Sequence, residues 1–160
     1  MVNPTPQGPD KAVRQHTYLR ALETVPDLSI HLGRFSTNVK QRYLASTLAS
    51  ATPTKVEVLE YEEKGSDVNL ASYLLVDGFA GEYDVAIVVS NDSDLAEPIR
   101  LVWSRLSLKV GLLNPRRYTA FDLQGIADFY QQVRRGPLSA SQFPSTLTDA
   151  YGTITKPADW

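Results

Sequence analysis

The alternation of hydrophobic and polar residues predicts two helices and two strands in the first half of the chain. Hydrophobic residues recur at helical spacing across residues 12–22, which predicts a helix. Residues 28–32 and 55–62 alternate between hydrophobic and polar side chains, as strands do. Residues 67–79 place their hydrophobic side chains on one helical face and predict a second helix. Residues 1–11 are rich in Pro, Gly and Asn and predict a loop.

The second half of the chain shows the same two kinds of pattern. Residues 84–89 form an uninterrupted hydrophobic run, typical of a parallel strand that is covered on both faces. A hydrophobic stripe over residues 95–106 predicts a helix, with Pro98 in its first turn, where a missing N–H costs little. Residues 107–113 then predict a strand, and residues 123–130 a short helix.

This order of elements predicts an α/β fold. Strands that alternate with helices pair in parallel through right-handed crossovers. A chain of 160 residues can bury one substantial core. We therefore expect one domain over residues 1–135 and a C-terminal extension over residues 136–160, which is rich in Ser, Thr, Gly and Pro.

Composition narrows the class of protein. The formal net charge is −2, so there is no overall attraction to nucleic acid, and binding of this kind needs a local patch. The absence of cysteine excludes disulfides and thiolate metal sites and fits a reducing cytoplasm. No hydrophobic run approaches the roughly 20 residues of a membrane helix, and the polar start does not resemble a signal peptide. The sequence thus predicts a soluble cytoplasmic protein without a membrane partner.

Acidic residues follow the hydrophobic run in the order Ser90, Asn91, Asp92, Ser93, Asp94. Ligands of parallel α/β sheets bind beyond the carboxyl ends of the strands, so Asp92 and Asp94 belong to that rim. A right-handed crossover returns the start of the preceding helix, at Asp67, to the same rim. Three neighbouring carboxylates repel one another unless a cation lies among them, and Mg²⁺ or Mn²⁺ suits such a site. Such a cation can polarise a phosphoryl oxygen and activate water for phosphodiester hydrolysis.

Helix capping is the alternative role for these aspartates. Asp67 can cap its helix, and Asp94 with Glu97 three residues later fits a reciprocal cap. Asp92 is harder to explain in this way, because Asp94 already serves the helix. An EF-hand is disfavoured, since the residues after Asp94 lack the glycine and the further ligand of that loop. The residues alone predict an acidic metal site and leave capping open.

Two segments resemble the NYN domain family in its LabA-like branch. They are Glu63-Lys-Gly-Ser-Asp-Val-Asn-Leu-Ala71 and, after a predicted helix, Tyr83-Asp-Val-Ala-Ile-Val-Val-Ser-Asn-Asp-Ser-Asp-Leu95. The resemblance implies a PIN-like three-layer α/β/α fold with a mainly parallel sheet. It also implies a metal-dependent ribonuclease that hydrolyses RNA through carboxylate-bound Mg²⁺ or Mn²⁺.

The resemblance assigns roles to five residues. Asp67 matches the acid of the family's Lys-Gly-x-Asp motif, and Asp92 and Asp94 match the acids of its Ser-Gly-Asp-Ser-Asp motif. These three are therefore the implied catalytic residues and metal ligands. Ser90 matches the first serine, while Asn91 stands where many relatives have Gly, and both are expected to support the site.

The chain departs from the family pattern at its N-terminus. The usual first strand, which carries an Asp in a hydrophobic–Asp–Gly–x–Asn pattern, is missing together with a second strand. The resemblance therefore implies an N-terminally incomplete sheet and one missing metal ligand. We expect a fragment, a mis-started product, or one half of an assembly, with a homo-oligomer or a completing chain as partner.

Arg116, Arg117 and Tyr118 follow the strand at residues 107–113 and belong to the same rim. Guanidinium groups and an aromatic ring can bind RNA phosphates and stack on a base, whereas a solvated basic turn is the alternative. The predicted function is thus a metal-dependent ribonuclease with RNA as partner. A non-catalytic RNA- or protein-interaction module of the same fold, inactive or dependent on a completing chain, is the alternative function.

The two histidines and Trp103 have structural interpretations. His16 lies in a predicted helix and His31 in a predicted strand, and both are distant in sequence from the acidic motifs. A hydrogen-bonded structural histidine is the favoured reading of each. Trp103 borders the hydrophobic stripe of its helix, which predicts a place in the core.

Overall fold

The computed structural model describes residues 10–49 and 51–158, and these fall into two compact units. Unit 1 runs up to Ser66 and includes the chain from Thr148 onward. Unit 2 spans Asp67–Leu147. The loop expected at residues 1–11 lies outside the described residues except for its last two, which belong to the first helix rather than to a loop.

Unit 1 begins with α1, Asp10–Glu23, which confirms the helix predicted from the spacing of hydrophobic residues. The Arg20 guanidinium of α1 donates to both carboxylate oxygens of Asp149, with Nη2–Oδ1 and Nη2–Oδ2 distances of 2.7 Å. This ion pair holds the pKa of Asp149 below its usual range. Asp149 is the last residue of β6, Thr146–Asp149, which pairs with β7, Gly152–Thr155. The pair thus ties α1 to the C-terminal hairpin.

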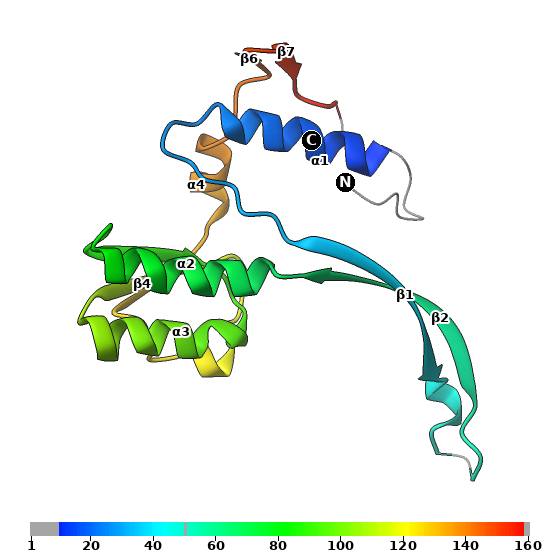
Figure 1. Ribbon diagram of the computed structural model, residues 1–160. Helices are drawn as coiled ribbons and strands as arrows, with labels where there is room; N and C mark the ends of the chain where they lie inside the picture. The colour runs from blue at the N-terminus through cyan, green and yellow to red at the C-terminus, as the bar shows by residue number, and fades with distance from the viewer. Residues whose placement is uncertain (1–9, 50, 159–160) are drawn as a thin grey trace. The chain divides into compact units, whose positions relative to one another are not determined.

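A long hairpin forms the rest of unit 1 (Figure 1). Strand β1, Arg34–Tyr43, pairs antiparallel with β2, Lys55–Lys64, over ten residue pairs. The strand expected at residues 28–32 is wrong, because the strand starts only at Arg34 and His31 lies before it. Hydrogen bonding to β2 decides this start, since the register ends at the pair of Arg34 and Lys64. The strand predicted at residues 55–62 is confirmed, in an antiparallel pair.

Unit 2 alternates helices and strands from α2 to β4, as the sequence pattern predicts. Its elements are α2 (Ser66–Ala80), β3 (Val85–Val89), α3 (Ala96–Leu101), a π-helix (Val102–Leu106), β4 (Lys109–Asn114), β5 (Phe129–Gln132) and α4 (Arg135–Ala140), with 3-10 turns at Ser93–Leu95 and Phe121–Leu123. The predicted helices at residues 67–79 and 95–106 and the strands at 84–89 and 107–113 are confirmed. Pro98 lies in the first turn of α3.

The helix expected at residues 123–130 is wrong. A single 3-10 turn is followed by Gly125 with φ +76°, which ends any helix, and then by β5. The four residues of β5 pair in parallel with Gly111–Asn114 of β4. Pairing with a strand that is distant in sequence therefore overrides the local hydrophobic spacing.

Strands β3, β4 and β5 form one parallel sheet in that order, so the fold is α/β as expected. One face of this sheet packs against both α2 and α3, which lie next to each other in Figure 1. Val88 and Leu112 from the strands meet Leu74 of α2 and Ile99 of α3 in a single hydrophobic core. Leu112 and Ile99 have no exposed surface.

The opposite face of the sheet is open in unit 2. Val85, Ile87 and Val89 are 45–59% exposed, so the expectation that this strand is covered on both faces is wrong. Both helices approach the side of Val88, and strand alternation turns its neighbours away from them. The α/β class with a parallel sheet is thereby established, and the observed layers are one sheet and one helical layer.

Across residues 10–49 and 51–158, no helix is long and apolar enough to cross a membrane.

Candidate functional site

The predicted acidic motif forms a tight loop after β3. Ser90 Oγ accepts a hydrogen bond from the backbone N–H of Asp92 at 3.1 Å. Asp92 Oδ1 accepts one from the backbone N–H of Asp94 at 3.0 Å, so Asp92 is the N-cap of the turn Ser93–Leu95. The expectation that Asp94 rather than Asp92 serves as the cap is therefore wrong. The Asp92 carboxylate therefore faces the backbone of its own loop, at Asp94.

The three aspartates of the predicted metal site do not gather into one cluster in the described part of the chain. Among the described residues, no three His, Cys, Asp or Glu side chains lie close enough together to hold a metal ion. The prediction of a metal-binding site with Mg²⁺ or Mn²⁺ on Asp67, Asp92 and Asp94 is therefore not supported. Asp67 lies in the first turn of α2, and Asp92 is used in capping. We assign no metal role to these residues.

Asn91 does connect two segments of the predicted rim. Its Oδ1 accepts a hydrogen bond from the backbone N–H of Ala120 at 2.9 Å. Ala120 belongs to the loop after β4 that also carries Arg116, Arg117 and Tyr118. The structure thus brings the loops after β3 and β4 together at one edge of the sheet, as expected for parallel strands.

The basic residues of that second loop are on the surface. The Arg117 guanidinium lies over the Tyr118 ring, 5.3 Å from its centroid, and the backbone N–H of Arg116 donates to Asn114 Oδ1 at 2.7 Å. Arg117 and Tyr118 are exposed. RNA binding by these three residues stays a prediction.

Asn114, which the sequence did not single out, anchors this edge of the sheet. It is the last residue of β4 and has no exposed surface. Its Nδ2 donates to the hydroxyl of Tyr130 at 2.6 Å, while its Oδ1 holds the loop through Arg116. A buried amide needs such partners, because an unsatisfied polar group costs free energy. The only sequence signal is an Asn that directly follows a hydrophobic strand and precedes Pro115.

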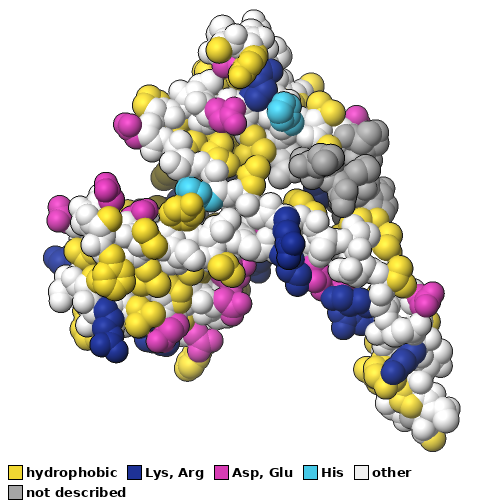
Figure 2. All heavy atoms as spheres, viewed as in Figure 1, with side chains coloured by type: hydrophobic (Ala, Val, Ile, Leu, Met, Phe, Trp, Pro, Cys, Tyr) yellow, Lys and Arg dark blue, Asp and Glu magenta, His cyan; other side chains and the backbone are white. Residues whose placement is uncertain are grey.

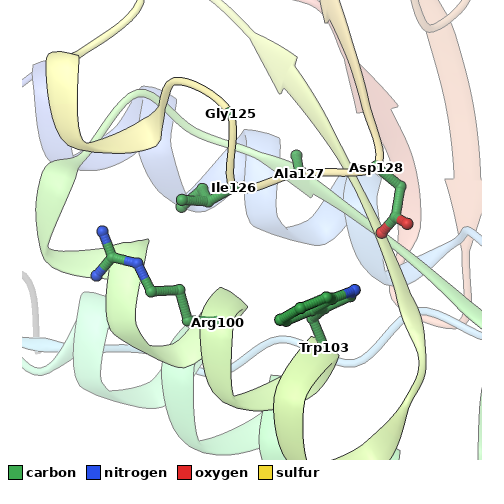
Figure 3. Close-up of a pocket in the computed structure, with 6 residues that line it drawn as sticks. All are labelled: Arg100, Trp103, Gly125, Ile126, Ala127 and Asp128. Carbon is green, nitrogen blue, oxygen red and sulfur yellow. The ribbon is translucent and has the colours of Figure 1, made fainter.

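A shallow pocket of about 390 Å³ lies on another side of unit 2. It is lined by Arg100, Trp103, Gly125, Ile126, Ala127 and Asp128. Figure 3 shows Arg100 and Trp103 on the helix and Gly125–Asp128 on the loop that faces it. The indole ring lies beneath this loop, with the Asp128 carboxylate beyond its edge.

Trp103 is 64% exposed, so its predicted place in the core is wrong. It lies in the π-helix that continues α3. The wider turn of a π-helix shifts each following side chain around the axis, and such turns are frequent at functional sites. Val102 takes the buried position instead, and the indole ring turns to the pocket.

The pocket has one fixed and one exchangeable charge. Asp128 Oδ2 accepts a hydrogen bond from the backbone N–H of Val110 at 2.8 Å, which fixes its carboxylate. Arg100 pairs with Glu97 at 3.3 Å on the surface, and such a pair contributes little. A flat aromatic ring can therefore stack on Trp103 while Arg100 binds an acidic group of the same molecule.

The chain is similar to one curated protein of known activity, a 6-hydroxy-3-succinoylpyridine 3-monooxygenase of Pseudomonas putida. The two are 28% identical over 162 residues, which cover 94% of this chain and 52% of that enzyme. The chain thus spans about half the length of the relative. This relative is an oxidative enzyme, and the similarity overturns the ribonuclease prediction.

The other comparisons add little. A crystal structure of a Vibrio parahaemolyticus protein of unknown function matches with a TM-score of 0.48 and 17% identity, over 84% of this chain and 65% of that one. No protein-family model matches the chain. The NYN resemblance stays a prediction.

Proposed function

We propose that this chain is the substrate-binding part of an oxidative enzyme of the monooxygenase type that acts on a small heteroaromatic acid. The observation that carries the proposal is the similarity to a monooxygenase over 94% of the chain. The pocket at Trp103 supports it, because its residues suit a flat ring with an acidic substituent. The chain spans 52% of the relative, so the oxidative reaction of the whole relative is itself only proposed for this chain.

Three side chains would each make a different contact with such a substrate. The Trp103 indole offers a face for stacking on a pyridine ring. Arg100 would exchange its surface partner Glu97 for the substrate carboxylate, which a guanidinium binds through two parallel hydrogen bonds. Asp128, held by Val110 N–H, would accept a hydrogen bond from a ring hydroxyl or ring N–H. Together these contacts would orient one edge of the ring.

Oxygenation requires groups beyond these side chains. In a monooxygenase, one atom of dioxygen is transferred to the substrate, and the other leaves as water with two electrons and two protons from a reductant. A cofactor activates the dioxygen. The sequence has no Gly-x-Gly-x-x-Gly dinucleotide motif, and the described residues include no cluster of three metal-ligating side chains. These residues do not fit such a group, so we assign them binding alone.

A ligand titration tests the proposal. The chain is titrated with 6-hydroxy-3-succinoylpyridine, the compound in the relative's name, and heat or indole fluorescence is followed. We expect saturable binding that Arg100→Gln weakens about tenfold, because one charged bidentate contact is lost. Arg117→Gln removes an equal charge from the loop after β4, away from the pocket, and serves as the matched control.

Two results would count against the proposal. Absence of saturable binding by the unmodified chain contradicts it, and so does an equal loss in the Arg100 and Arg117 variants. A second assay adds a nicotinamide reductant and air and looks by mass spectrometry for a product that has gained an oxygen atom.

For the fold, we propose that the sheet of unit 2 belongs to a PIN-like three-layer arrangement. Parallel sheets are normally covered on both faces, and Val85, Ile87 and Val89 are exposed on the open face. Ile87→Cys tests this proposal through the rate at which a thiol reagent labels the new cysteine in the full chain. Slow labelling relative to Tyr118→Cys supports a third layer, and equally fast labelling contradicts it.

A further inference from the structure

The β1–β2 ribbon has two chemically different faces, because side chains of a strand point alternately to opposite sides. One face carries a network of ion pairs. Lys40 contacts both Glu60 and Glu62, Arg42 Nη2 lies 2.6 Å from Glu60 Oε1, and Lys64 Nζ lies 2.6 Å from Glu62 Oε2. Hydrogen bonds from Lys40 and Lys64 lower the pKa of Glu62 to about 2. Both carboxylates of this face, Glu60 and Glu62, are thus paired within the ribbon, and the cations are in excess.

The second face is hydrophobic and aromatic. Phe35, Val39 and Tyr43 of β1 share it with Leu59 and Tyr61 of β2. Val39 and Leu59 are directly paired at its centre and are 64% and 54% exposed. Figure 2 shows hydrophobic side chains along the ribbon as far as its tip. Thr37, Gln41 and Glu57 also lie on this face, and the pair of Gln41 and Glu57 separates Val39 and Leu59 from Tyr43. A two-stranded ribbon is marginal alone in water, and exposed hydrophobic side chains that gather on one face mark an interface.

We propose that this aromatic face binds the same face of a second copy of the chain, with the two ribbons stacked and running in opposite directions. A two-fold axis would then pass over the pair of Val39 and Leu59. The interface is isologous, so each contact occurs twice.

Charge complementarity favours this orientation. On the aromatic face, Lys55 lies at the tip, where its Nζ is 4.8 Å from the centroid of the Tyr43 ring. Glu63 lies at the other end of the same face, paired with Phe35. Its Oε1 already accepts hydrogen bonds from the backbone N–H and the hydroxyl of Ser66, so a partner's lysine would add to these contacts. When the ribbons run in opposite directions, Lys55 faces the partner's Glu63, and Phe35 faces the partner's Tyr43. When they run in the same direction, Glu63 would face the aromatic ring of the partner's Phe35, and no opposite charges would meet.

The size of the face sets the strength of the contact. Ten residues at about 3.3 Å each make a strip roughly 33 Å long and two strands wide. Such a strip offers less than the roughly 800 Å² per partner of a standard interface. We therefore expect a weak dimer that forms with rising concentration.

Sedimentation equilibrium of the full chain across micromolar to millimolar concentrations tests the proposal. We expect a monomer–dimer equilibrium that Lys55→Glu weakens roughly tenfold, because like charges then meet at both ends. The combined variant K55E/E63K restores opposite charges in the proposed register and should regain the dimer. Glu63→Lys alone loses the hydrogen bonds from Ser66, and circular dichroism of that variant checks that the chain stays folded. Val39→Asp, at an exposed position, should abolish the dimer without unfolding the chain, as circular dichroism checks.

Each alternative result overturns the proposal. A monomer at all concentrations contradicts the dimer itself. A dimer that survives Val39→Asp uses another surface, such as the open face of the sheet in unit 2. A dimer lost in Lys55→Glu and not regained in K55E/E63K contradicts the opposite direction of the ribbons.

Discussion

Backbone hydrogen bonds between strands hold both the antiparallel β1–β2 ribbon and the parallel β3–β4–β5 sheet, but the two regions differ in how far their side chains are buried. In the sheet, α2 and α3 cover one face, and Leu112 and Ile99 lose all contact with solvent. In the ribbon, the directly paired Val39 and Leu59 both stay more than half exposed. The difference lies in the covering helices. Where helices cover the strands, their side chains form a core that stabilises the fold, and where no helix covers them, they form a surface available for binding. Four predictions test this difference, from the largest expected effect to the smallest.

Leu112→Ala should have the largest effect. The side chain is fully buried in the core of unit 2, so its truncation leaves a cavity and should cost about 3 kcal/mol. Leu59→Ala, on the exposed face of the ribbon, is the matched control and should cost less than about 0.5 kcal/mol at low protein concentration. Urea unfolding of both variants measures the difference. Equal losses would contradict the contrast between the two regions.

Gly111→Ala should destabilise the sheet by about 1–3 kcal/mol. A Cβ at this position would lie 2.1 Å from the Phe129 ring, which packs over the glycine from the neighbouring strand. The double variant G111A/F129A removes the clash, so its loss should be smaller than the sum of the two single losses. Additive losses in thermal unfolding would show that the ring does not cover Gly111.

Asn114→Ala should cost about 1–2 kcal/mol, since its hydrogen bonds to Tyr130 and to the loop at Arg116 are buried. Tyr130→Phe removes only the hydroxyl and should cost less. Amide exchange of residues 115–120 provides a second measure, because the loop loses its anchor in the Asn114 variant alone. Unchanged exchange in that variant would contradict the role of Asn114.

Acid should loosen the ribbon by the smallest amount. The pKa of Glu62 is lowered from 4.5 to about 2 by its lysine partners. Its contribution to stability is therefore present above pH 4.5 and is lost as the pH falls through about 2. Amide chemical shifts of β1 and β2 should change over this range. Lys40 and Arg42 also lower the pKa of Glu60, so the test compares Glu62→Gln with E60Q/E62Q. The single variant should reduce the change and the double variant should remove it, and an undiminished change in Glu62→Gln would assign it to another group.

Much of unit 2 could be predicted from the sequence, because its helices and strands carry clear hydrophobic patterns. The run at Val85–Val89 and the stripe of α3 led to the correct elements. The errors at residues 28–32 and 123–130 share one cause. In both segments, strand pairing with residues that are distant in sequence decides the conformation, and local spacing does not record it.

The candidate site was harder to predict. The sequence placed the loops after β3 and β4 at one rim, which the hydrogen bond from Ala120 N–H to Asn91 bears out. It could not show that Asp92 caps a turn, since a cap and a metal ligand use the same carboxylate oxygens. It also missed the pocket at Trp103, because a π-helix rotates that residue away from the core.

The sequence by itself determined the α/β class, the order of the elements of unit 2 from α2 to β4, and the hydrophobic strands β3 and β4. These depend on local periodicity, which a chain carries in its own residues. The tertiary structure decided the antiparallel ribbon, the open face of the sheet, the burial and hydrogen-bond partners of Asn114 and the exposure of Trp103. Each of these depends on which distant segments meet. Burial and hydrogen bonding then assign a role that the residue type alone leaves open.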